Sequence, residues 1–449
     1  MGSRIFYIKT FGCQMNERDS EIMAQSLAAH GYREGQEISE ADLIIINTCS
    51  IRAKAEQKVM SLLGMLRKEK KDRPALKICV AGCVAQQEGE QLLRRMPHVD
   101  FVIGTQNIYN IIELLEEQPG NKKVLTAMSD AYDIPRFIPE FQPENHLLPS
   151  LLARPFKKFV TIMQGCNNFC SYCIVPYTRG REISRNKDDI IDEVNVLVEH
   201  GVREITLLGQ NVNSYGLANT VTRNGSPYSF PLLLKDVAQS GLKRLRFTTS
   251  HPKDLSDDLI QCFQEIEILC NQIHLPVQAG SDSVLKKMNR KYTVTDYLHK
   301  VDALRSSCPD IAITTDIIVG FPGETDRDFE QTMRLLEEVR FNGSFSFKYS
   351  DRSGTKSSGF GEKVTEKIKA ERLSRFQARQ DEISLEKNSA FTDTSMTVMV
   401  ESINTKGFQG RSVFNHVVHV ESLLPSAPGD LIDVTIFHAG QHSLQGRII

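Results

Sequence analysis

The chain has 449 residues, enough for two to four domains. Its 40% hydrophobic and 24% charged residues are typical of a globular protein, and no apolar run approaches the roughly 20 residues that span a bilayer. A formal net charge of −2 excludes a globally basic nucleic-acid binder, so any contact with nucleic acid must use local patches.

The first part of the chain alternates apolar segments with amphipathic ones. Continuous apolar strands separated by helices predict a parallel, doubly wound α/β sheet, because such strands are buried on both faces. We expect this domain to span residues 3–125. The expected strands are 5–8, 41–46, 76–80 and 101–103, and the expected helices are 18–30, 51–68 and 86–95.

A proline-rich stretch, residues 126–150, breaks this rhythm and is interpreted as a linker. The second domain, expected at 147–384, returns to strands and helices in six units. Six such units suit a partial (β/α)6 barrel, and periodicity alone leaves another open sheet as the alternative. The expected strands are 159–163, 204–208, 244–249, 272–277, 311–319 and 343–349, and the expected helices include 188–200, 255–267, 294–306 and 327–339.

The third part, expected at 386–449, changes character. Segments rich in Val and Thr alternate with polar turns, which predicts a small antiparallel β barrel of a kind often used on RNA. The expected strands are 394–400, 410–420 and 431–437.

The chain contains ten cysteines, and its N-terminus shows no secretory signal, because Lys9 and Arg18 interrupt it too early. We therefore expect a cytoplasmic protein without a membrane anchor. In a reducing compartment, so many cysteines indicate metal or redox chemistry rather than disulfides.

Three cysteines form a compact triad with C-x3-C-x2-C spacing, Cys166, Cys170 and Cys173. They follow the first strand of the expected barrel, and the active sites of such barrels lie at the carboxyl ends of the strands. Thiolates are the usual ligands of iron–sulfur clusters, which normally have four, so three leave one iron open to chemistry. A zinc site is the rival interpretation, but it would need a fourth Cys or His nearby, and none follows Cys173 closely.

Three further cysteines, Cys13, Cys49 and Cys83, form a dispersed triad. Each follows a strand of the first domain, at the edge where open α/β sheets place their ligands. We predict that they converge on a second cluster. The remaining cysteines, Cys79, Cys262, Cys270 and Cys308, are interpreted as structural.

Several short basic stretches are candidates for nucleic-acid contact, although each one can equally be a solvated face. The candidates are residues 156–158, 243–246 and 286–291, together with Arg179, Arg181 and Arg185. The alternative for these three arginines is an ion pair with Glu182 or Asp188.

The motifs around both triads resemble those of the methylthiotransferase family of radical S-adenosylmethionine (SAM) enzymes, from end to end of the chain. Residues 410–415 and 442–446 resemble the family's C-terminal TRAM domain, an RNA-binding β barrel. One departure is Ser353, where the family usually has Pro. The motifs are TFGCQMN at 10–16, NTCSIR at 47–52, AGCVAQ at 81–86 and GCNNFCSYC at 165–173.

Within the family, the chain is most similar to a tRNA-modifying branch. The similarity lies in residues 173–185, 14–16 and 86–90. The resemblance implies a transferase that adds a methylthio group to C2 of N6-dimethylallyladenosine at position 37, next to the anticodon. Sister branches, which modify a ribosomal-protein aspartate or threonylcarbamoyl-adenosine in tRNA, are the alternatives. A non-catalytic RNA-binding or sulfur-carrying protein is a further alternative, which the intact C-x3-C-x2-C loop disfavours.

The resemblance also implies two [4Fe-4S] clusters and SAM as cofactors. The cluster on the compact triad cleaves SAM, and the cluster on the dispersed triad holds the sulfur. Radical chemistry is needed because an aromatic C–H bond offers neither a leaving group nor an acidic proton, and cofactors carry such chemistry. The expected SAM contacts lie at strand ends, where each can instead be a satisfied polar group: Gly209, Gln210, Asn211, Ser250, Gln278 and Asp316.

The expected partners follow from the same resemblance. They are a tRNA anticodon stem-loop that carries N6-dimethylallyladenosine, an electron donor such as a flavodoxin-type reductant, and a sulfur donor. We expect a monomer. Arg179, Arg181 and Arg185 lie just past the compact triad and are the candidates for phosphate contact or substrate positioning.

Overall fold

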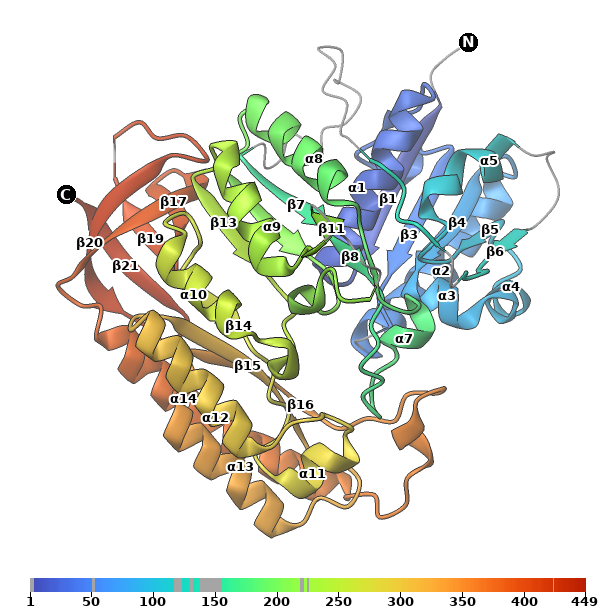
Figure 1. The fold of residues 1–449 in the computed structure, drawn as a ribbon. Helices are drawn as coiled ribbons and strands as arrows, with labels where there is room; N and C mark the ends of the chain where they lie inside the picture. The colour runs from blue at the N-terminus through green and yellow to red at the C-terminus, as the bar shows by residue number, and fades with distance from the viewer. Residues whose placement is uncertain are drawn as a thin grey trace.

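The computed structural model describes residues 4–50, 53–116, 123–129, 132–137, 156–218, 222–223, 226–422 and 424–449. An N-terminal sheet and a C-terminal barrel lie on opposite sides of a central strand–helix part (Figure 1). The described residues of the expected linker, 126–129 and 132–137, contain no helix or strand, and its remainder lies outside the described residues. Within the described ranges, no helix is long and apolar enough to cross a membrane.

The N-terminal sheet is parallel throughout, with strand order β2-β1-β3-β4-β5-β6. Separate hydrophobic clusters cover its two faces, which confirms the doubly wound prediction. The strands are β1 (Ile5–Phe11), β2 (Arg33–Glu34), β3 (Leu43–Thr48), β4 (Lys77–Gly82), β5 (Phe101–Ile103) and β6 (Lys123–Leu125). The helices are α1 (Gln14–Ala29), α2 (Ala53–Asp72), α3 (Cys83–Glu88), α4 (Glu90–Arg95) and α5 (Ile111–Glu116).

The prediction of one helix over 86–95 is wrong. Two helices, α3 and α4, meet at Gly89, whose φ of 49° lies in the left-handed region and breaks the helical path. The first of them also begins earlier, at Cys83, directly after β4.

The central part forms an open arc of six parallel strands. Its two sheets, β7-β10-β13 and β14-β15-β16, are linked by a parallel bridge between Leu245 and Leu269. The strands follow one another in chain order, whereas a doubly wound sheet reverses its order at a switch point. The partial barrel is therefore confirmed over the open-sheet alternative.

The bounds of the central elements agree with the expected ones to within a few residues. The strands are β7 (Lys157–Thr161), β10 (Glu204–Leu208), β13 (Arg244–Phe247), β14 (Gln272–His274), β15 (Ala312–Val319) and β16 (Gly343–Lys348), with short pairs β8 (Met163–Gln164) and β9 (Ile183–Ser184), and β11 (Thr222–Arg223) and β12 (Ser226–Pro227). The helices are α7 (Val175–Thr178), α8 (Lys187–Glu199), α9 (Phe230–Val237), α10 (Asp257–Glu265), α11 (Asp282–Lys287), α12 (Val294–Ser307), α13 (Asp326–Val339) and α14 (Glu366–Ser389).

The C-terminal part is a closed barrel with strand order β17-β18-β19-β21-β20, which confirms the prediction of a small barrel. Its strands pair antiparallel as expected, except that β19 and β21 run parallel. The single strand expected over 410–420 is wrong, because a turn containing Asn415, with φ of 71°, separates two antiparallel strands there. One further strand was not predicted. The strands are β17 (Ser395–Asn404), β18 (Gly407–Ser412), β19 (Val417–Glu421), β20 (Leu431–Ala439) and β21 (Ser443–Ile448).

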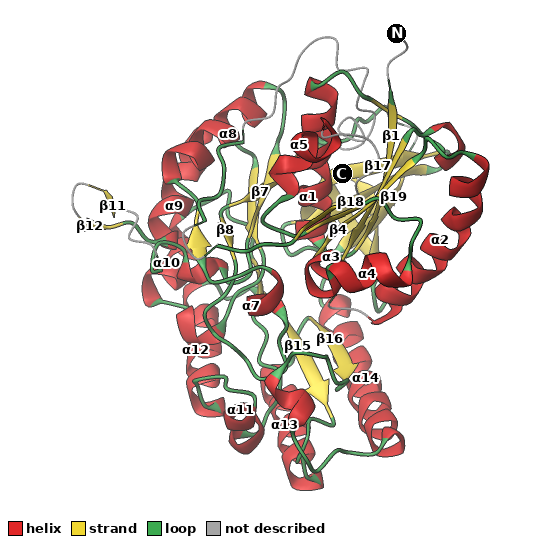
Figure 2. Ribbon diagram, turned by 90° about the vertical axis from the view of Figure 1, so that its right-hand side faces the viewer, coloured by secondary structure: helices red, strands yellow, loops and turns green. Residues whose placement is uncertain are grey.

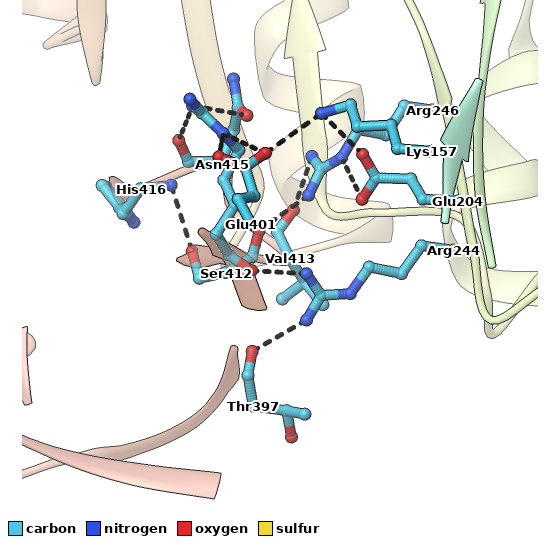
Figure 3. Close-up of polar contacts among 11 residues, drawn as sticks. Lys157, Glu204, Arg244, Arg246, Thr397, Glu401, Ser412, Val413, Asn415 and His416 are labelled. Atoms are coloured by element: carbon cyan, nitrogen blue, oxygen red, sulfur yellow. Dashed lines mark hydrogen bonds and ion pairs between the residues drawn. The ribbon is translucent and has the colours of Figure 1, made fainter. Parts of the chain in front are cut away.

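The C-terminal barrel docks on the amino ends of the central strands (Figure 3). Arg244 donates to the backbone carbonyls of Thr397 and Arg411, at 2.9 and 2.5 Å. Arg246 donates to Ser412 O at 2.7 Å and pairs with Glu204 at 3.2 Å. The basic stretch at 243–246 therefore contributes two buried domain contacts, and the hypothesis that these two arginines face nucleic acid is wrong.

Candidate active site

The dispersed triad lies along the carboxyl edge of the N-terminal sheet. Cys13, Cys49 and Cys83 follow β1, β3 and β4, which are neighbouring strands. Cys49 is central, and its thiol shares hydrogen bonds with both Cys13 and Cys83. The sheet register thus brings together three thiols that are widely spaced in sequence.

Two asparagines and a glycine fix this edge. Asn16 Nδ2 donates to Asn47 Oδ1 at 3.0 Å and to Thr48 O at 3.2 Å, and Asn47 returns a bond to Asn16 O at 2.8 Å. Gly82 has a φ of 90°, and a Cβ there would lie 2.4 Å from Asn47 Oδ1. Only glycine lets β4 enter α3 so close to its neighbours.

A buried cation lies beside the dispersed triad. Arg179 pairs with Asp19 at 2.6 Å, and both side chains are buried. The hydrogen bond from Cys49 lowers the pKa of Cys13 to about 6 and that of Cys83 to about 7, and the positive charge of Arg179 adds to the effect on each. The same shared hydrogen bonds, with burial, raise the pKa of Cys49, so only the two outer thiols of this triad are shifted toward the thiolate, the form that binds iron.

The compact triad lies in one loop between β8 and α7, at the carboxyl end of the first barrel strand. Burial raises the pKa of Cys166 to about 11 and that of Cys173 to about 12. Phe169, between the first two cysteines, has a φ of 46°, and the loop's entry at Gly165 has a φ of 79°. A Cβ on Gly165 would lie 2.0 Å from Arg181 O, so this turn requires glycine.

The segment that follows α11 holds this loop in place. Arg290 Nη1 lies 3.4 Å from Cys170 Sγ and donates to it, while its Nη2 donates to Pro276 O at 2.7 Å. Asn289 Nδ2 donates to the carbonyls of Asn168 and Phe169, at 3.1 and 3.0 Å. Arg290, in the basic stretch at 286–291, is thus buried beside the candidate ligand Cys170. The sequence did not reveal this role, because the whole stretch has the pattern of a solvated basic patch.

The candidate SAM contacts lie at the carboxyl end of the barrel. Gln210 Oε1 accepts from Gly165 N at 2.5 Å, next to Cys166. The backbone of Gln278, with φ of 75°, bonds to both Asp316 O and Ile318 N. Gly209 packs against Met163, where a Cβ would lie 2.3 Å from that side chain.

Several buried polar atoms at this end have no hydrogen-bond partner among the described residues. They are Gln164 Nε2, Gln210 Nε2, Asn211 Oδ1, Ser250 Oγ and His251 Nε2. Buried polar groups are normally satisfied, so such a group of unpaired donors and acceptors fits a polar ligand like SAM. His251 and Gln164 were not predicted, and no spacing in the sequence distinguishes them.

The three candidate arginines have different surroundings. Arg179 and Arg185 are buried and pair with Asp19 and Glu193, not with Glu182 or Asp188, the partners of the ion-pair alternative. These positions do not suit direct contact with phosphate. Arg181 is exposed and stacks on Phe169, with its guanidinium carbon 5.5 Å from the ring centre.

Buried contacts connect the two triads. The helix α7, just past Cys173, packs against α3, which begins at Cys83, and the two lie side by side in Figure 2. Arg352, after β16, donates to the carbonyl of Ser50, next to Cys49. Glu193 of α8 pairs with Arg18 of α1 and with Arg185. The two halves of the site are therefore held as one unit.

The donor chemistry of both triads suits iron–sulfur clusters. No three metal-binding side chains in the described ranges converge as ligands of one ion. A cubane has other requirements, since each thiolate binds a different iron at a corner of the cluster. Each triad supplies three thiols and leaves a fourth position open, which is the donor set of a cubane with one free iron.

Two family models match the chain. Residues 5–104 match the "Uncharacterized protein family UPF0004", and residues 160–336 match the "Radical SAM superfamily". Among solved structures, the radical SAM methyltransferase TsrM from Kitasatospora setae has a TM-score of 0.57 at 12% identity, covering 77% of this chain and 73% of its own. At that identity, the likeness shows the fold alone.

Curated relatives extend the match to the full length. A tRNA-2-methylthio-N(6)-dimethylallyladenosine synthase of Desulfotalea psychrophila is 59% identical, covering 100% of both chains. One of the same name from Geobacter metallireducens is 49% identical, covering 100% of this chain and 99% of its own. The chain therefore belongs to the tRNA-2-methylthio-N(6)-dimethylallyladenosine synthase (MiaB) family of radical SAM methylthiotransferases.

Proposed function

We propose that this protein adds a methylthio group to C2 of N6-dimethylallyladenosine at position 37 of tRNA. Family membership over the whole chain supports this reading over the ribosomal-protein and threonylcarbamoyl-adenosine alternatives. The structural observation that supports it best is Arg179, which lies six residues past Cys173 in sequence and pairs at 2.6 Å with Asp19 of α1, the helix that begins directly after Cys13. The two triads thus border one site, as a two-part reaction requires.

In this proposal, Cys166, Cys170 and Cys173 hold the cluster that works with SAM, and Cys13, Cys49 and Cys83 hold the auxiliary cluster. Bound [4Fe-4S] clusters supply one-electron chemistry and an iron site for sulfur, which protein side chains lack. Gln210, Asn211 and Ser250 orient SAM through their unpaired polar atoms. Arg290 fixes the orientation of the Cys170 thiolate through its hydrogen bond.

Gly209 and Gln278 remain candidates for the same SAM site, whereas Asp316, whose carboxylate lies 3.3 Å from His274 Nε2, is better placed to contact the substrate. Gly209 permits close approach at the end of β10, and Gln278 connects the mouth of the barrel to Asp316. Of the three candidate arginines, Arg181 is the one we assign to RNA, because it is exposed beside the compact triad. Arg179 and Arg185 act instead by positioning the two halves of the site.

We assign three domains: residues 3–125 for the auxiliary cluster, 147–384 for the radical SAM core and 386–449 as an RNA-binding TRAM domain. The partners are the anticodon stem-loop of a tRNA, a flavodoxin-type electron donor and a sulfur donor. The enzyme works as a monomer in the cytoplasm.

A base in a folded loop must leave its stack before its C2 can reach a reactive centre, so the enzyme extrudes the target base.

Nucleoside mass spectrometry on tRNA from a strain that lacks this gene tests the proposal. We expect the methylthio-dimethylallyl nucleoside to be absent and its unmethylthiolated precursor to accumulate. The wild-type gene should restore the product, and the Cys166→Ala variant should not. An unchanged nucleoside profile, with a ribosomal protein altered in mass, would refute the tRNA assignment.

A further inference from the structure

The inner wall of the partial barrel carries two exposed phenylalanines. Phe345 is 57% exposed and Phe347 is 46% exposed, and both belong to β16, the last strand of the arc. Small parallel barrels normally fill their interior with packed side chains. Large apolar side chains left open to solvent mark a binding surface.

The register of β16 shows which way these rings point. Ser346 accepts a hydrogen bond from Gln377, and Lys348 pairs with Glu366, so the alternate residues face α14 on the outside. Phe345 and Phe347 therefore face the opposite side, because successive strand residues point to opposite faces. They pair in register with Asp316 and Ile318 of β15, which share the inner face.

A polar pair lies next to the rings. His274 Nε2 lies 3.3 Å from Asp316 Oδ1, and the imidazole meets the Phe345 ring edge-on, with ring centres 5.8 Å apart. The buried positions of β15, such as Thr315 and Ile317, point outward to the helices and leave this pair accessible from within. The imidazole and the carboxylate can hydrogen-bond to the edge of a purine, and the two phenylalanine rings can stack on its face.

This wall is continuous with the mouth of the barrel. The backbone of Gln278, a candidate SAM contact, bonds on both sides of Ile317, to Asp316 O and Ile318 N at 2.9 Å each. Ile318 and Tyr172, the latter between Cys170 and Cys173, pack against the same hydrophobic cluster. The wall and the compact triad are therefore linked through one hydrophobic cluster.

We infer that Phe345 and Phe347, with His274 and Asp316, form the seat of the substrate base, an adenine with an apolar N6 substituent. This inference rests on the proposed function and names the residues that recognise its substrate. One ring stacks on the purine and the other packs against the N6 alkyl group. The His274–Asp316 pair contacts the purine edge. Base–aromatic stacking is worth enough for each ring to change affinity by about 5- to 150-fold.

The test uses the reconstituted holoprotein and two anticodon stem-loop RNAs that differ only in the dimethylallyl group. Fluorescence anisotropy gives the Kd of each RNA for the wild type, Phe345→Ala and Phe347→Ala. A matched control is Phe437→Ala, which removes an equally large ring that is 42% exposed on the C-terminal barrel. Thermal unfolding of each variant verifies that it remains folded.

We expect the wild type to prefer the modified RNA, and Phe345→Ala or Phe347→Ala to reduce that preference at least fivefold. Phe437→Ala should leave the ratio of the two affinities unchanged. A preference that persists in both wall variants overturns the inference while leaving the proposed function intact. Equal weakening of both RNAs, or a change in sedimentation that reveals a dimer interface, also overturns it. A wild type that does not distinguish the RNAs contradicts the proposed function itself.

Discussion

The dispersed triad is assembled from three strand ends of one sheet, whereas the compact triad is carried by a single loop. Beside the dispersed triad, shared thiol hydrogen bonds and Arg179 lower the pKa of Cys13 and Cys83. In the compact triad, burial raises the pKa of Cys166 and Cys173. Cys49, between those two thiols, has its pKa shifted upward, so a bound cluster must displace protons in both triads. The clearer difference is one of construction: strand ends of one sheet position the first triad, and one loop positions the second.

The largest expected effect comes from removing one triad at a time. A variant with Cys166, Cys170 and Cys173 all replaced by Ala should fall from about eight irons per chain to about four, because we propose one four-iron cluster on each triad. Cleavage of SAM should drop below detection. Iron analysis and chromatography of 5′-deoxyadenosine, after anaerobic reconstitution, measure both. An iron content near eight in this variant would mean that the compact triad holds no cluster.

The cation between the triads should have the next largest effect. Arg179→Met leaves the carboxylate of Asp19 buried and unpaired, which typically costs about 3–5 kcal/mol of unfolding free energy. Chemical denaturation of the apoprotein measures the loss. The matched control is Arg181→Met, two residues away and exposed, which should change the stability by less than about 1 kcal/mol. Equal losses in the two variants would argue against a buried Arg179–Asp19 pair.

Each triad has a glycine with positive φ directly before one of its cysteines, Gly82 before Cys83 and Gly165 before Cys166. Gly82→Ala and Gly165→Ala each force a left-handed conformation and a close contact, a cost of order 1–3 kcal/mol. We expect Gly82→Ala to lower the iron content of the dispersed triad and Gly165→Ala that of the compact triad. Each substitution is made in a background that lacks the other triad, so that one cluster is counted. Loss of iron from the wrong triad would show that these turns do not shape their own sites.

The smallest effect is expected from a cysteine outside both triads. Cys79 is buried in the middle of β4, and Cys79→Ala should leave both the iron content and SAM cleavage at wild-type levels. A modest loss of stability from the small cavity is the only expected change. Reduced iron in this variant would show that a ligand set has been misassigned.

Strand alternation and cysteine spacing were sufficient to predict the three-part fold and the convergence of Cys13, Cys49 and Cys83. They succeeded because parallel strands bring their carboxyl ends to one edge, whatever the separation in sequence. The break at Gly89 and the turn at Asn415 were missed, since each depends on a single residue with positive φ. A one-residue break leaves the hydrophobic pattern nearly intact.

Polar partners across domains could not be predicted. Arg179 was interpreted as a candidate for phosphate contact or for a local ion pair, yet its partner Asp19 comes from α1 of the N-terminal domain. Arg244 and Arg246 read as a nucleic-acid patch, yet they bind backbone carbonyls of the C-terminal barrel (Figure 3). The charge pattern of a segment does not say whether another domain covers it.

The central claim is that the two triads perform separate tasks in one reaction. Its most direct test is the variant with Cys13, Cys49 and Cys83 replaced by Ala, incubated with SAM, reductant and an anticodon stem-loop RNA bearing N6-dimethylallyladenosine. We predict that 5′-deoxyadenosine still forms, while mass spectrometry of the RNA finds no methylthio product. Methylthiolated RNA at the wild-type level, or loss of SAM cleavage despite an intact compact cluster, would contradict the division of labour.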